Sequence, residues 1–236
     1  MMTRATERLR AALGLGDPFA EPPLETLGED LQGWAGTDPL LRRAIETVRP
    51  RLVLEVGTWK GQSAVFMAEA CRELGLDAAV LCIDTWLGSL EHLVDDEFRP
   101  LLAIRRGRPT IYEQFMANVR ARGLQAYLTP LPQTSTTAAR FLRQRGISAD
   151  LVYLDASHEE QDVLADLEAY WPLLRPGGLL IGDDCIAVFP GVARACAAFA
   201  RRHGLEPRVH GVKFLLQKAE ATDGGTGAAA SIPTAA

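Results

Sequence analysis

The sequence predicts an α/β protein built on a doubly wound, mostly parallel sheet of seven strands. From residue 51 onward, short apolar runs alternate with helical patterns, as in parallel strands joined by right-handed crossovers. The apolar runs are continuous and do not alternate with polar residues, which is typical of strands covered by helices on both faces. Two short segments within 208–217, with Gly211 between them, predict a C-terminal antiparallel hairpin.

Length and composition fit one domain with extensions. The chain has 236 residues, of which 47% are hydrophobic and 23% charged, and this composition excludes disordered, collagen-like and disulfide-scaffold classes. No apolar stretch approaches the ~18 residues of a membrane span, and the start lacks the apolar core of a signal peptide. We therefore expect a cytoplasmic protein with no membrane partner.

Charge and cysteine content narrow the class further. The net charge of -5 argues against a nucleic-acid partner, which would usually require a basic face. The four cysteines are scattered and form no CxxC pair, so we expect buried thiols and no zinc cage: Cys71, Cys82, Cys185 and Cys196.

Helical patterns and tails flank the central domain. An amphipathic pattern at 4–15 and a second at 39–48, which stops at Pro50, predict an N-terminal helical extension over residues 1–50. The main domain follows at 51–218. Residues 219–236 contain one large apolar residue, Ile232, and are expected to form a loose tail.

Five apolar runs predict the parallel strands, namely 51–56, 79–84, 125–130, 150–155 and 178–183. Helical spacing of apolar residues separates the first two, over 64–74, and precedes the fifth, over 163–174. Pro172 lies inside the second of these patterns, so that helix should kink or end early.

One connection is too long for an ordinary strand-to-helix turn. About 25 residues separate Trp86 from the helical stretch 112–122, whereas such turns have ~2–6 residues. We expect the insert 86–111 to be a lid or an oligomer contact. Its basic run, Arg105, Arg106 and Arg108, would suit a nucleotide-sugar diphosphate or a solvated surface equally well.

A glycine-containing loop closes the first strand, with the sequence Glu55-Val-Gly57-Thr58-Trp-Lys-Gly61-Gln-Ser63. Two glycines let the backbone turn sharply and approach a ligand. A carboxylate at Glu55 would repel a pyrophosphate but would suit an ammonium or sulfonium group. The GxxxG spacing is neither the GxGxxG of NAD enzymes nor a P-loop, although a plain turn would also explain it.

Polar residues also follow the second and third strands. Asp84 closes the second strand at a distance from Gly61 that is common for an acid holding a ribose diol, although a helix N-cap is an equal alternative. Gln133 and Ser135 lie just past the third strand. They could contact an adenine edge, and capping of the next helix explains Ser135 almost as well.

Three carboxylates and a histidine follow strands four and five. Asp155, Asp183 and Asp184 should converge because these strand ends are neighbours, and such a set would raise its own pKa values unless a cation lay among its members. Oxygen ligands suit Mg²⁺ or Mn²⁺. His158 would then take a proton from a bound hydroxyl. The alternative is that the aspartates cap a turn and His158 is solvated.

Taken together, these motifs resemble class I S-adenosylmethionine-dependent O-methyltransferases, which have a Rossmann-like methyltransferase fold. The similarity runs from residue 52 to 217 through Glu-x-Gly-x-x-x-Gly, LDASH and LRPGGLLIGDD, and is strongest to the bacterial metal-dependent sugar and natural-product (cephalosporin-hydroxylase-like) group. The resemblance implies S-adenosylmethionine and Mg²⁺ (or Mn²⁺) as cofactors. The implied cofactor-binding residues are Glu55, Gly57, Thr58, Gly61, Ser63, Asp84, Thr85, Gln133, Ser135 and Asp155.

The resemblance also assigns roles on the acceptor side. Asp155, Asp183 and Asp184 match the metal ligands, and His158 and Asp155 would be the catalytic pair. Cys185 stands where a larger residue is expected, and nothing in the insert matches a substrate-binding residue.

The resulting hypothesis is methyl transfer to a hydroxyl oxygen of a small molecule, such as a sugar or natural product, by a homo-oligomer. Two alternatives stay open. One is a metal-independent methyltransferase of the same fold that uses His158 and a neighbouring acid. The other is a non-catalytic nucleoside-binding regulatory protein.

Overall fold

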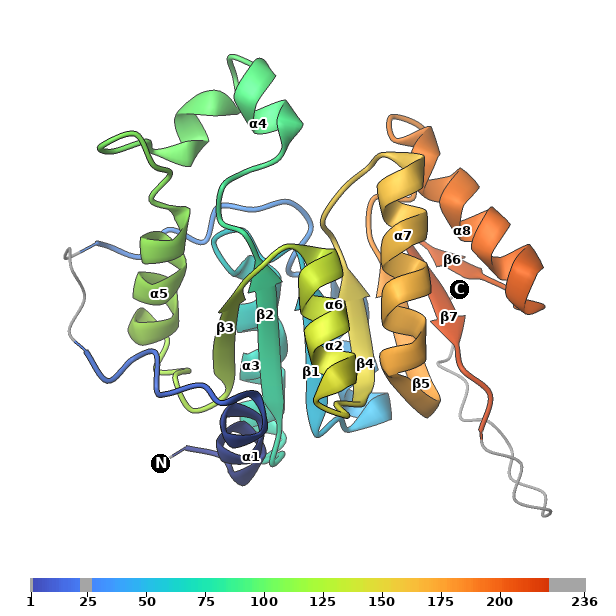
Figure 1. Cartoon of the computed structure of the whole chain (residues 1–236), viewed down its shortest axis with the longest axis horizontal. Helices are drawn as coiled ribbons and strands as arrows, with labels where there is room; N and C mark the ends of the chain where they lie inside the picture. Colours follow the sequence, from blue (N-terminus) through green and yellow to red (C-terminus); the bar gives the residue numbers. More distant parts are fainter. Residues whose placement is uncertain (1, 22–26, 221–236) are drawn as a thin grey trace.

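A single mixed sheet organises the chain in a computed structural model that describes residues 2–21 and 27–220 (Figure 1). Its order is β3-β2-β1-β4-β5-β7-β6. The first five strands in this order are parallel, and β7 pairs antiparallel with both β5 and β6. The strands are β1 (Leu52–Val56), β2 (Ala79–Asp84), β3 (Leu128–Pro132), β4 (Ala149–Leu154), β5 (Leu174–Gly182), β6 (Arg208–His210) and β7 (Lys213–Gln217).

Helices cover both faces of this sheet. One apolar layer packs α2, α3 and α5 against it, and the other packs α1, α6, α7 and α8. The helices are α1 (Arg4–Leu13), α2 (Pro39–Val48), α3 (Gln62–Glu73), α4 (Leu90–Val94), α5 (Ile111–Ala121), α6 (Ser135–Gln144), α7 (Glu160–Tyr170) and α8 (Pro190–His203). The predicted fold class, a doubly wound sheet with a C-terminal hairpin, is confirmed.

The continuous apolar runs follow from this double cover. Successive strand residues point to opposite faces, so Val53 enters one layer while Leu54 enters the other. Val152 and Tyr153 of β4 divide in the same way. A strand buried on both faces therefore shows no polar alternation.

Two sequence expectations need correction. The third strand runs from Leu128 to Pro132 and not over 125–130, because Gln125 to Tyr127 form a turn that closes on Leu124. The first helix ends at Leu13, where Gly14 takes a left-handed conformation (φ +68°) and its N–H caps the last turn. The expected early end of the helix before Pro172 is confirmed, since α7 stops at Tyr170 and a short 3₁₀ turn, Trp171–Leu173, follows.

The insert contains α4 and a 3₁₀ turn, Arg99–Leu102. Figure 1 shows α4 and α1 at opposite ends of the molecule. Of the expected tail, residues 221–236 lie outside the described part of the chain. Within residues 2–21 and 27–220, no helix has the length and apolar character that a membrane crossing requires.

Candidate active site at the carboxyl edge of the sheet

The loops after β1, β2, β4 and β5 meet at the carboxyl edge of the sheet. Val56 lies opposite Ile83 on one side and Leu154 on the other, and Leu154 lies opposite Gly182. Gly57, Asp155 and Asp183 each follow one of these positions and open a loop at the same edge, and Asp84, which follows Ile83, is the last residue of β2. The strand ends are therefore neighbours as predicted, and they bring together Gly57, Asp84, Asp155 and Asp183.

The glycine loop after β1 lies directly against the loop after β4. Gly57 has a φ of +85°, and a Cβ there would overlap the backbone carbonyl of Asp155. Gly61 has a φ of +89°, and its Cβ would press on the ring of Phe115. Only glycine satisfies both the backbone angle and the close approach at these two positions.

Glu55 lies beneath this loop and fixes its shape. Its side chain is fully buried, and its two oxygens accept hydrogen bonds from the hydroxyls of Thr58 (2.8 Å) and Ser63 (2.6 Å). Burial raises the pKa of Glu55 to about 7, although both hydroxyls favour the charged form. Glu55 thus orders the loop from below, and its predicted contact with a ligand stays a prediction.

Asp84 holds the same loop from the side of β2. One carboxylate oxygen accepts the backbone N–H groups of Thr58 and Trp59, both at 2.8 Å, and the other accepts the N–H of Trp86 at 2.7 Å. A carboxylate can accept about four hydrogen bonds, so Asp84 retains capacity for a ligand hydroxyl. The next residue, Thr85, caps the start of the insert by accepting the N–H of Leu87.

Residues 27–38, here called the N-terminal strap, cross the outside of the glycine loop. Asp30 pairs with Lys60 at 2.6 Å, and the Gln32 side chain accepts the indole N–H of Trp59 at 3.1 Å. The rings of Trp34 and Trp59 lie 5.8 Å apart. Sequence reasoning missed this element, because a segment without helix or strand has no periodic pattern to find.

The two residues expected beside an adenine differ in their surroundings. Gln133 is exposed at the carboxyl edge, and its backbone N–H binds the carbonyl of Asp84 at 3.0 Å. Ser135 is the first residue of α6 and donates its hydroxyl to the buried Asp166 of α7. The N-cap of α6 is Thr134, which accepts the N–H of Thr137. Neither contact tests the adenine prediction.

The acidic residues after β4 and β5 have a buried cation among them. Lys213, the first residue of β7, is completely buried and forms an ion pair with Asp183. The hydroxyl of Tyr153 also binds Asp183 and lies 3.2 Å from Asp155. Burial, with the charges of Asp183 and Asp184, raises the pKa of Asp155 well above its usual range. Sequence reasoning missed both Lys213 and Tyr153.

His158 lies between two carboxylates. Its Nε2 is 2.9 Å from Asp184 and its Nδ1 is 3.1 Å from Glu91 of α4, and its ring stacks on Phe189 at 3.8 Å. Burial lowers the pKa of His158, but the hydrogen bonds and charges of Asp184 and Glu91 outweigh this effect and raise it to about 9. In this arrangement His158 is a cation at neutral pH.

Helix α4 contacts both the histidine loop and the glycine loop. Beside Glu91, which binds His158, the next residue His92 stacks on Trp59 at a centroid distance of 4.4 Å. The Nδ1 of His92 binds the hydroxyl of Ser89 at 2.7 Å, while its Nε2 is buried without a partner. Burial lowers the pKa of His92, so this ring is neutral at pH 7.

The predicted metal ligands do not form a free oxygen cage. Asp183 is paired with Lys213, and Asp184 with His158. Among the described residues, no group of three or more His, Cys, Asp or Glu side chains is arranged to hold a metal ion. The residues present therefore do not fit Mg²⁺ in this arrangement, because two of the three carboxylates already bind cationic side chains.

Four of the five predicted carboxylates of this edge divide into two sets, and the fifth, Asp155, lies 3.2 Å from the Tyr153 hydroxyl. Glu55 and Asp84, beside the glycine loop, form no ion pair with a described lysine, arginine or histidine. Asp183 and Asp184, on the other side, have cationic partners. A cationic ligand would therefore be accommodated beside the glycine loop and not beside β5, and this donor set fits S-adenosylmethionine, which carries a sulfonium and an ammonium group.

The parallel sheet with its antiparallel hairpin, the glycine loop and the acids at strand ends define a class I methyltransferase domain. Residues 54–185, more than half of the chain, match the family described as "Methyltransferase domain". The chain belongs to this family, and the resemblance predicted from the sequence is confirmed at this level.

One curated relative is similar over most of this chain. The uncharacterized protein y4gI of Sinorhizobium fredii (strain NBRC 101917 / NGR234) is 26% identical over 185 residues, which are 78% of this chain and 18% of that protein. The chain thus spans about one fifth of the length of this relative.

Two solved structures share the fold. The O-methyltransferase TomG from Streptomyces achromogenes, in complex with SAM, has a TM-score of 0.58 at 18% identity and covers 94% of this chain and 92% of its own. The O-methyltransferase NovP has a TM-score of 0.57 at 19% identity, covering 77% and 79%.

Proposed function

We propose that the chain transfers the methyl group of S-adenosylmethionine to a hydroxyl oxygen of a small molecule. The division of charges at the carboxyl edge is the observation that carries this proposal. Carboxylates without cationic partners lie at the glycine loop, and a histidine held by two acids lies in the adjoining loop. The family and the O-methyltransferase neighbours support the same chemistry.

On the cofactor side, residues of the glycine loop and of the strand ends would bind and orient S-adenosylmethionine. Glu55 keeps the loop in its bent form through Thr58 and Ser63, so that Gly57 and Gly61 present their backbone to the ligand. When bound, S-adenosylmethionine supplies a methyl group on a positively charged sulfur. The ribose would lie at Asp84 and Thr85, and the adenine near Gln133 and Ser135.

On the acceptor side, His158 would remove the hydroxyl proton. A cationic His158 accepts no proton, so Glu91 must leave it when the acceptor enters, which lowers the pKa of the imidazole toward neutrality. Asp155, whose raised pKa favours the protonated form, would hold the acceptor oxygen by a hydrogen bond. Proton transfer of this kind contributes typically ~10² to 10⁴ in rate.

The proposal takes the metal-independent form. Assistance by Mg²⁺, which the sequence resemblance implies, would require Asp183 and Asp184 to give up Lys213 and His158. A homo-oligomer and a cytoplasmic location stay predictions. The acceptor class, whether sugar or other natural product, stays a prediction as well.

We also propose that helix α4 and the residues that flank it form a lid over the site. The insert exposes large apolar side chains beside the site, namely Leu87, Leu90, Leu93, Val94 and Ile104. The space under the carboxyl edge, lined in part by Asp155, His158 and Asp184, measures about 10 Å³ and holds about one water. Glu91 of α4 occupies the Nδ1 of His158, so an acceptor that reaches this imidazole would need α4 to move away, and the exposed apolar residues would contact the acceptor or a second subunit.

The test combines binding with product formation. Calorimetry should detect S-adenosylmethionine binding without added Mg²⁺, and a panel of vicinal diols and phenols should yield S-adenosylhomocysteine. His158→Ala should lower turnover by ~10² to 10⁴ and leave cofactor affinity unchanged. The control is His203→Ala at the end of α8, which pairs with Glu168 outside the site.

Each result decides a separate part of the proposal. Absence of cofactor binding would contradict it entirely. Binding without any S-adenosylhomocysteine across the panel would favour the regulatory alternative. Full turnover by His158→Ala would remove the base assignment and leave the rest intact.

A further inference from the structure

Lys213 lies opposite Asp183 because of the register of the C-terminal hairpin. The antiparallel pairing of β5 with β7 places Gly182 opposite Phe214, so the next residues outward, Asp183 and Lys213, face each other. The Lys213 side chain is completely buried and that of Asp183 is 3% exposed. Among the described residues, Lys213 is the only lysine at this edge that is completely buried. Its ammonium group binds Asp183, which is a predicted metal ligand.

Tyr153 extends the charge of Lys213 to a second carboxylate. The ammonium group of Lys213 lies 3.2 Å from the Tyr153 hydroxyl, which in turn lies within hydrogen-bond distance of Asp183 and of Asp155. Burial raises the pKa of Tyr153, so the hydroxyl keeps its single hydrogen and can donate it to one of these two acids at a time. Lys213 thus supports Asp183 directly and Asp155 through one hydroxyl.

The third predicted ligand has its own partner. Asp184 binds the Nε2 of His158 at 2.9 Å. A divalent cation entering here would have to displace that imidazole from Asp184, and it would have to leave the Lys213 ammonium buried without a carboxylate. Both effects oppose metal binding.

We propose that Lys213 takes the place of the divalent cation, so that the chain organises its acceptor carboxylates with a built-in ammonium group and binds no metal there. Lys213 is then a positioning residue, since it acts through Asp183 and Tyr153 and not on the reacting atoms. This inference rests on the proposed function only where turnover is measured, because metal binding can be measured without it.

The experiment is a Mn²⁺ titration of the purified full chain, followed by the electron paramagnetic resonance signal of free Mn²⁺. The wild-type chain should show no stoichiometric binding. Lys213→Met should bind one Mn²⁺ at least about tenfold more tightly, because a positive charge is removed from three converging carboxylates. Asp183→Asn added to Lys213→Met should abolish that gain, which locates the metal.

A matched control separates this effect from the change in net charge. Lys218→Met removes a lysine from the end of the same hairpin, where its ammonium group binds the backbone carbonyls of Trp171 and Leu174 and no carboxylate of the described residues. It should leave Mn²⁺ binding at the wild-type level. Lys213→Gln serves as the second variant if Lys213→Met does not fold.

The outcomes decide between a replacement cation and a purely structural lysine. Stoichiometric Mn²⁺ binding by the wild-type chain would overturn the inference, and so would a folded Lys213 variant that gains no affinity. Turnover that is unchanged by EDTA would agree with it. If no methyl transfer is found at all, the proposed function fails while the Mn²⁺ result still decides the role of Lys213.

Discussion

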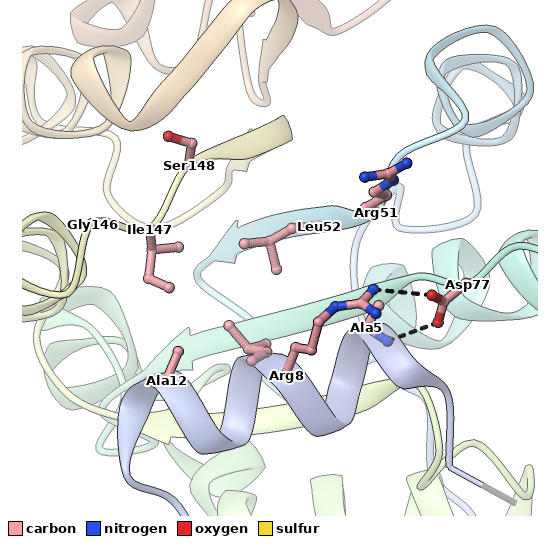
Figure 2. Close-up of a pocket in the computed structure, with 10 residues that line it drawn as sticks. Ala5, Arg8, Ala12, Arg51, Leu52, Asp77, Gly146, Ile147 and Ser148 are labelled. Carbon is pink, nitrogen blue, oxygen red and sulfur yellow. Dashed lines mark hydrogen bonds and ion pairs between the residues drawn. The ribbon is translucent and has the colours of Figure 1, made fainter.

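The two edges of the sheet carry opposite combinations of space and charge. At the amino edge, a surface pocket of about 530 Å³ opens between α1, the start of β1 and the loop before β4 (Figure 2). Figure 2 shows Arg8 and the backbone of Ala5 directed at Asp77. The Arg8 and Asp77 side chains are 61% and 47% exposed. At the carboxyl edge, the pocket lined in part by Asp155 and Asp183 measures about 10 Å³, and the ion pair of Lys213 with Asp183 is excluded from water.

This difference teaches that buried charge, and not open volume, distinguishes the edge where we propose the chemistry. An exposed ion pair is screened by water and contributes little to stability or to specificity. A buried pair persists only where the surrounding fold holds both partners, so it marks a place where groups are fixed for a task. Four predictions test this contrast.

The largest expected effect is on stability at the carboxyl edge. Asp183→Ala leaves Lys213 buried without a carboxylate, with only the Tyr153 hydroxyl beside it, and should lower the free energy of unfolding by about 3–5 kcal/mol. Asp77→Ala at the amino edge should cost less, about 1–2 kcal/mol, because its ion pair is exposed and its other contact is the N–H of Ala5 in the first turn of α1. Urea unfolding measures both, and equal losses would break the comparison.

The second prediction concerns the pH dependence of stability through Glu55. The pKa of Glu55 is raised from 4.5 to about 7 in the folded chain. Its contribution to the free energy of unfolding is therefore fully present below pH 4.5 and is lost as the pH rises through about 7. Glu55→Gln carries no charge, so at pH 8 its free energy of unfolding should exceed that of wild type by up to about 3 kcal/mol, at about 1.4 kcal/mol per pKa unit. At pH 4 the two values should differ little.

The measurement is urea unfolding across this pH range. Glu46→Gln on the exposed side of α2 is the control, and it should run parallel to wild type. Parallel curves for Glu55→Gln as well would mean that Glu55 is charged in the folded chain at neutral pH.

The third prediction concerns the contact between the lid and the base. Glu91→Gln removes one of the two charges that raise the pKa of His158, so neutral His158 becomes more populated at pH 7. If the proposed function holds, the acid limb of kcat/KM should move to lower pH by up to about one unit, less than for a buried pair because Glu91 is partly exposed. Glu97→Gln, elsewhere in the insert, should leave the profile in place.

The smallest effect is expected at the amino-edge pocket. Arg8→Ala should change the free energy of unfolding by less than about 1 kcal/mol and leave S-adenosylmethionine affinity unchanged. Calorimetry checks the second point. A loss of cofactor affinity would show that the large pocket communicates with the opposite edge.

Local chemistry explains which parts of the fold the sequence predicts. Continuous apolar runs identify the strands because both faces are covered, and Pro172 and Gly211 mark a helix end and a turn through their own backbone restrictions. The sequence pattern places the third strand too early, because the preceding turn, around Tyr127, contains apolar residues that resemble a strand.

The candidate site is predictable where it depends on strand ends and not where it depends on distant pairing. Asp155 and Asp183 meet because their strands are parallel neighbours, which the alternation of elements already indicates. Lys213 meets Asp183 through the register of a hairpin 30 residues later, and a lone lysine gives no signal of that register. Glu91 reaches His158 from an insert whose path no periodicity describes.

Helix α4 has only five residues, yet consecutive side chains tie it to two different loops. Glu91 binds the histidine loop and His92 stacks on the tryptophan of the glycine loop. Neighbouring residues on a helix point about 100° apart, so this one turn bridges the two halves of the site. A displacement of α4 that uncovers one half also uncovers the other, so the two substrates of the proposed reaction would share a single gate. The substrate that first displaces α4 would then set the order in which they enter.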